Sequence, residues 1–123
     1  MPVTITWDNA EQSVIRAVGE NWSTNEFHHD FDTITHMIRN SQTHVLGIIV
    51  ENLDGEYSKR DYMSVFKRVA RIGKIPTAFV KLTHMQAMML QTVIQIYKPE
   101  KQIYIVNTLE EARSIICQNN ASI

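Results

Sequence analysis

The residues of this chain with the most evident potential for chemistry lie on one predicted helix. His28, Asp32 and His36 recur every four residues, so they share one helix face. Imidazoles at this spacing can bind zinc. The two histidines, however, would lie about 12 Å apart along the axis, too far for one ion to contact both. We therefore predict no metal site here and interpret this face as a solvated polar surface opposite Phe27 and Phe31.

Ser58 raises a second question, because it stands in "NLDGEYSKRD" directly before an amphipathic run. A serine at a helix start accepts hydrogen bonds from the first turn, worth about 1 kcal/mol. Asp61 at the third helical position would complete that cap. The alternative is that Ser58 is phosphorylated, since a phosphate suits a helix start and two cations follow. Three acids in the same turn oppose that added charge, so we favour the cap.

Signatures of catalysis are missing from the sequence. Its four glycines stand apart and form no phosphate-binding loop, and neither a nucleophile elbow nor a zinc-protease motif occurs. We interpret Cys117, on the last predicted helix, as a small buried hydrophobic residue. Asp8, Glu51 and Asp54 could gather near strand ends. We expect no enzyme, no catalytic residue and no cofactor.

The stretch "HMQAMMLQTVIQIYK" is the most informative helix. Its apolar residues cover an arc of roughly 220°, while a helix on a sheet needs only a little over about 100°. Methionine-rich faces adapt to several partners. The excess could be covered by neighbouring helices or by a second copy of the chain, and the pattern leaves both open. The residues predicted for such an interface are Met85, Met88, Met89, Thr92 and Ile96.

Hydrophobic periodicity divides the rest of the chain into alternating elements. Alternating or continuous apolar runs predict strands at 3–8, 13–19, 44–53, 76–83 and 102–108. Helices are predicted to begin after Ser23, at Ser58, after Thr83 and after Thr108. The inward stripes of the first two helices are Phe27, Phe31, Ile34 and Ile38, then Tyr62, Val65, Phe66 and Val69.

This element order, ββαβαβαβα, predicts an α/β fold with a single mixed sheet of about five strands and four helices. The first two strands form a hairpin, because only four residues separate them. The later strands are parallel, because helical crossovers join them. The continuous apolar run at 45–50 predicts a strand in the middle of the sheet, covered on both faces.

Length and composition suggest one ordinary globular domain. The chain has 123 residues, of which 44% are hydrophobic and 20% charged. A net charge of -1 gives no attraction to nucleic acid or to an anionic membrane. A single cysteine and an N-terminus unlike a signal peptide favour the cytoplasm. No apolar run approaches the roughly 20 residues of a membrane span.

The element order and length resemble the STAS domain family, typified by bacterial anti-sigma-factor antagonists. The resemblance covers residues 1–123 and rests on the apolar third strand, the helix at Ser58 and the closing "NTLEEARSII". The chain also resembles small bacterial STAS-like proteins that begin with "ITWD" and carry a capped first helix, here Trp22-Ser23 to Glu26. Ser58 occupies the place of the family's phosphorylated serine, although the paired serine and following Gly-Leu are absent.

The resemblance implies a regulatory or scaffolding domain that binds proteins without catalysis. It would be a homodimer or would bind another regulatory protein. A small apolar or lipid-like ligand, or a phosphorylation switch at Ser58, are the alternatives that it leaves open.

Overall fold

The structure, a computed structural model, describes residues 4–11, 13–19, 24–40, 45–51, 59–70, 75–98 and 101–121. The elements follow in the predicted order ββαβαβαβα. They are β1 (Thr4–Trp7), β2 (Val14–Val18), α1 (Thr24–Asn40), β3 (Gly47–Glu51), α2 (Lys59–Ala70), β4 (Thr77–Val80), α3 (His84–Tyr97), β5 (Ile103–Val106) and α4 (Leu109–Ala121). The predicted fold class is therefore confirmed.

The five strands form one mixed sheet in the order β1-β2-β3-β4-β5. β1 and β2 are an antiparallel hairpin, with Thr4 opposite Val18, and every later pair is parallel. β3 lies in the middle, and all five of its residues are buried. The prediction of a central strand is confirmed, because its β-branched side chains meet helices on both faces, but the strand begins at Gly47 and not at Val45.

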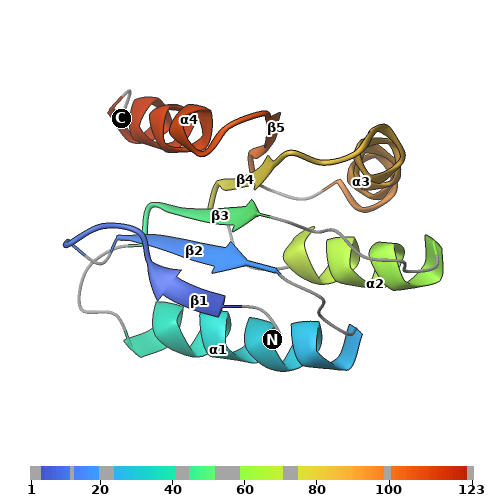
Figure 1. Ribbon diagram of the computed structural model, residues 1–123, viewed down its shortest axis with the longest axis horizontal. Coiled ribbons are helices and arrows are strands. Elements are labelled where there is room, and N and C mark those ends of the chain that lie inside the picture. The colour runs from blue at the N-terminus through green and yellow to red at the C-terminus, as the bar shows by residue number, and fades with distance from the viewer. Residues whose placement is uncertain are drawn as a thin grey trace.

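Three helices cover one face of the sheet, and α4 covers the other (Figure 1). Each crossover from β2 to β5 moves one strand further in the same direction, and such crossovers are right-handed. α1, α2 and α3 must therefore lie on the same face. α4 follows the last strand and packs on the opposite face.

The larger core lies under α1, α2 and α3. The predicted inward stripes are confirmed: Phe27, Phe31 and Ile34 are at most 2% exposed, and Val65 and Phe66 are fully buried. The ring of Phe66 meets that of Phe79 on β4 edge to face, with centroids 5.7 Å apart. These aromatic contacts fix α2 to the sheet, which in turn fixes the position of α3 beside it.

The smaller core lies between β3, β4, β5 and α4. Ala112 and Ile116, four residues apart, point from α4 onto Ile49 and Ala78. α4 can approach the sheet closely because residue 47 of β3 is glycine. A Cβ at that position would lie only 2.6 Å from Cγ2 of Ile116.

Two of the predicted helix caps are confirmed within the described ranges. The Thr83 hydroxyl accepts a hydrogen bond from the Gln86 amide, and the Gln86 side chain accepts one from the Thr83 amide. The Thr108 hydroxyl likewise accepts from the Glu111 amide at 3.1 Å. The predicted cap at Ser23 lies outside the described residues.

Candidate functional site

α3 is held rigidly at both ends and against α2. Its reciprocal cap has hydrogen bonds of 2.8 Å and 3.2 Å. At the other end Lys98 adopts the left-handed conformation with φ 44° and donates its amide to the carbonyl of Ile94. Gln86 is only 4% exposed and donates its side-chain amide to the Tyr62 hydroxyl of α2 at 3.1 Å. A buried hydrogen bond of this kind fixes the rotation of α3 about its axis.

The apolar arc of α3 is only partly covered by the rest of the chain. Leu90 and Val93 are fully buried. On the other side of the helix, Met85 and Met88 are each 55% exposed and Ile96 is 62% exposed. Thr92 lies in the same row and is exposed, and its hydroxyl donates to the Met88 carbonyl. We refer to Met85, Met88, Thr92 and Ile96 as the outer stripe.

The structure thus divides the five residues predicted for an interface. The outer stripe contains four of them, and they share one face because they follow helical spacing. Met89, the fifth, is 9% exposed and belongs to the core under α2 and α3. The contact between α2 and α3 covers the Met89 side of the arc and leaves the Met88 side to solvent.

The outer stripe lies on a helix that itself carries no acidic, lysine or arginine side chain among its 14 residues. On β5, Ile105 is 39% exposed and pairs in register with the core residue Phe79, so it lies on the same sheet face as α3. β5 is also the last strand of the sheet, and "IYIV" carries neither a charge nor a proline to protect its edge.

The backbone of β5 presents hydrogen-bonding groups to that edge. The carbonyls of Gln102 and Val106 accept hydrogen bonds from Thr77 and Lys81, on the β4 side. Because backbone groups alternate along a strand, those of Ile103 and Ile105 point the other way. Among the described residues, no strand lies beyond them.

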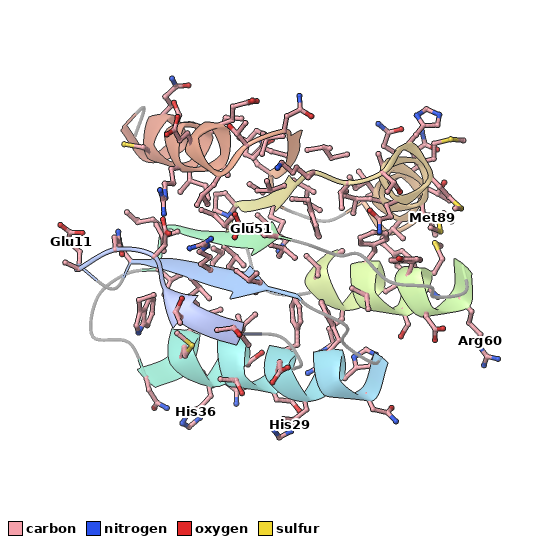
Figure 2. All side chains as sticks on the ribbon, in the orientation of Figure 1. Glu11, His29, His36, Glu51, Arg60 and Met89 are labelled. Atoms are coloured by element: carbon pink, nitrogen blue, oxygen red, sulfur yellow. The ribbon has the colours of Figure 1, made fainter. Side chains whose placement is uncertain are left out.

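The polar face of α1 is solvated at Asp32 and His36, as predicted, but it also contacts α2. Asp32 forms an ion pair with Arg68 of α2, and His28 Nε2 is 3.0 Å from the Ser64 hydroxyl. Figure 2 shows His29 and His36 on the outer side of α1, pointing away from the sheet. In the described ranges no three His, Cys, Asp or Glu side chains are grouped as around a metal ion.

The two described acids that could have gathered near strand ends lie apart. Asp8 follows β1, which is antiparallel to its neighbour, and therefore lies at the opposite end of the sheet from Glu51. Glu51 instead accepts a hydrogen bond from Arg16 Nε at 2.7 Å. Asp54 and the predicted cap or phosphorylation site Ser58 lie outside the described residues.

Among the described residues, α4 adjoins a cavity at each end of the sheet. One, of about 310 Å³, lies at the carboxyl ends of the parallel strands, where α/β proteins commonly bind ligands. It is bordered by Arg16, Glu51 and Lys81, and the charges of Arg16 and Glu51 already compensate each other. The other lies between the β1–β2 turn and the later part of α4.

The interpretation of Cys117 as a buried residue is also wrong. Its thiol is exposed and lines the second cavity, because Ile116 takes the inward position on α4. Beside it, Arg113 donates two hydrogen bonds to Asp8. The hydrogen bond that the guanidinium donates to Asp8 is the main cause that raises the pKa of Arg113. Sequence spacing offered no sign of this pair, which joins the first strand to the last helix.

No described helix is both long and apolar enough to span a bilayer. Comparison with known proteins found no matching protein-family model, curated protein or solved structure.

Proposed function

We propose that this chain is a STAS-like interaction domain without catalytic activity, which self-associates through the outer stripe of α3. The observation that carries the proposal is the exposure of Met85, Met88 and Ile96 on a helix without charged residues. Burial of half-exposed methionine and isoleucine side chains in an interface is favourable in free energy. The element order and the whole-chain resemblance to STAS domains support the family assignment.

A second copy of the chain is the partner that suits this surface. A residue close to a twofold axis contacts the same residue of the partner, so a charge there would meet a like charge. The outer stripe avoids this repulsion because none of its residues is ionisable. A partner that binds through charge complementarity would find no acidic, lysine or arginine side chain on α3.

The edge of β5 provides a second contact for another copy of the chain. Ile105 is exposed on the sheet face that α3 covers, and the outward backbone groups of Ile103 and Ile105 can pair with a strand. In the arrangement we propose, two β5 strands lie antiparallel across the twofold axis, and the outer stripes pack over them.

A regulatory or scaffolding role is the part of the proposal that rests on the resemblance to STAS domains. A reducing compartment, such as the cytoplasm, suits its single exposed thiol.

The test compares the mass in solution of the wild type, Met88→Glu, Ile96→Glu and the control Gln91→Glu. Gln91 is also exposed on α3 but lies outside the outer stripe, so this control adds the same charge to the same helix. We expect dimers for the wild type and Gln91→Glu, and monomers for the other two, by sedimentation equilibrium. Circular dichroism checks that each variant is folded.

Hydrogen exchange tests the role of the β5 edge. In the dimer the amides of Ile103 and Ile105 should exchange slowly, and in monomeric Met88→Glu they should exchange faster than those of β4. A wild type that stays monomeric up to high micromolar concentration overturns the proposal. A dimer that tolerates both charged replacements overturns it equally.

A further inference from the structure

The cavity between the β1–β2 turn and α4 lies on the face of the sheet opposite α1, α2 and α3. Its volume is about 310 Å³, at the small end of the range for ligand-binding cavities. Its apolar lining comes from Val14 and Leu46 on the sheet side and from Ile116 and Cys117 on α4. Ligand sites typically have such an apolar lining with a few polar groups at the border.

The polar groups at the border of this cavity are engaged with one another. Asn9 Oδ1 accepts hydrogen bonds from the amides of Ser13 and Val14, at 3.0 Å and 3.3 Å. Its side-chain amide donates to the Ser13 hydroxyl at 2.7 Å. These bonds tie Asn9 to Ser13 and Val14 and occupy the side chains of Asn9 and Ser13 on this side of the cavity.

The two charged groups at the border also compensate each other. Arg113 Nε and Nη2 donate to the two carboxylate oxygens of Asp8, at 2.8 Å and 2.7 Å. A charged ligand would have to compete with this bidentate pair, which is among the stronger hydrogen-bonded arrangements. An uncharged ligand would leave it intact.

The inner end of the cavity is rigid because of Gly47. Ile116 packs directly against the backbone of this residue, at a distance that excludes even a methyl group. Ile116 is 2% exposed and cannot move inward to fill the cavity. The apolar lining is therefore held in place by the smaller core.

From these observations we propose that the cavity between the β1–β2 turn and α4 binds a small, uncharged, apolar molecule. Burial of apolar surface provides the affinity, and the neutralised Asp8–Arg113 pair disfavours ionic ligands. The site is independent of the outer stripe, which lies on α3 across the sheet.

The probe is N-phenyl-1-naphthylamine, an uncharged aromatic dye whose fluorescence rises in apolar surroundings. We expect saturable binding to the wild type. Cys117→Trp should weaken it about tenfold or more, because the indole fills the cavity. The matched control is Gln118→Trp, which places the same side chain on the exposed side of α4. Binding to this control should equal that of the wild type.

Cys117 itself supplies a measurement that needs no variant. It is the only cysteine and it is exposed, so its rate of reaction with a thiol reagent reports on this cavity alone. Saturating dye should slow the reaction several-fold, as expected when a ligand covers the thiol.

The outcomes separate this site from the outer stripe. Dye binding that is lost in Met88→Glu and retained in Cys117→Trp would place the dye on α3 and overturn the cavity proposal. Absence of saturable binding, or an unchanged thiol reaction rate, overturns it as well. The dimer of the proposed function should persist in Cys117→Trp, so failure of either proposal is recognised separately.

Discussion

Arg113 on the last helix forms a bidentate ion pair with Asp8, the residue after the first strand, 105 positions away in the chain. The Asp8 side chain is 7% exposed and that of Arg113 is 47% exposed. The pair therefore joins the hairpin to α4 at the border of the cavity. Its acidic partner is well covered and its basic partner is half in water.

Removal of the Arg113 guanidinium should destabilise the protein, because the Asp8 carboxylate would remain without its partner. For Arg113→Met we expect a loss of about 1–2 kcal/mol in the free energy of unfolding, since Asp8 keeps its charge and loses both donors. The half-exposed arginine keeps the figure at this modest level. Urea denaturation measures the change, with Arg39→Met, an exposed arginine late in α1, as the control.

A double-mutant cycle isolates the pair. Asp8→Asn combined with Arg113→Met should lose less than the sum of the two single changes, because neither charge remains unpaired. Strict additivity would show that the pair does not couple the hairpin to α4.

Gly47→Ala should destabilise the packing of α4 on β3. The new Cβ would lie 2.6 Å from Cγ2 and 2.8 Å from Cδ1 of Ile116, so the helix must shift or Ile116 must leave its rotamer. We expect a loss of about 1–3 kcal/mol, typical of overpacking. Steric fit alone decides this, since alanine elsewhere in a strand would replace glycine favourably.

Ile116→Ala provides the compensating change. Alone it should cost about 2–5 kcal/mol through the void it leaves. Together with Gly47→Ala the cost should fall well below the sum, because the added methyl occupies part of that void. Thermal unfolding of the wild type, the two single variants and the double variant checks this. If the double variant loses as much stability as the two single variants together, the close contact is contradicted.

Lys101 should make stability depend on pH in the alkaline range. Burial lowers its pKa from 10.5 to about 8, and its ammonium donates to the Thr77 hydroxyl at 2.8 Å. Between these two pKa values the unfolded chain binds a proton that the folded chain does not. The contribution of Lys101 to stability therefore rises with pH across that window, and at neutral pH its burial is a net cost.

Lys101→Met removes that cost. The variant should be more stable than the wild type by about 1–2 kcal/mol near pH 7, after allowance for the lost hydrogen bond. Its advantage should shrink as the pH rises from about 8 toward 10. Urea denaturation at several pH values measures both, with the exposed Lys81→Met as the control. A stability difference that stays constant with pH would refute the explanation.

Much of the fold could be predicted because its signals are local. The capping pair of Thr83 and Gln86 and the stripe of Phe27, Phe31 and Ile34 depend on spacings within one or two helical turns. The apolar run of β3 is a property of consecutive residues. Each of these was readable without knowledge of any neighbour in space.

The candidate interface was predicted less sharply for a physical reason. Met88 and Met89 both belong to the broad apolar arc of α3, so sequence could not tell which of them solvent would reach. The answer depends on where α2 lies. The buried hydrogen bond from Gln86 to Tyr62 fixes which side of α3 faces α2. Met89 is consequently core and Met88 remains exposed.

The sequence by itself determined the order of the elements and the apolar side of each helix, because hydrophobic periodicity and helix capping depend on residues only a few positions apart. Only the tertiary structure decided that α4 is the one described helix on its face of the sheet, that Asp8 meets Arg113 and that Cys117 borders a cavity. These relations follow from strand order and crossover handedness, which bring together residues that no local pattern connects.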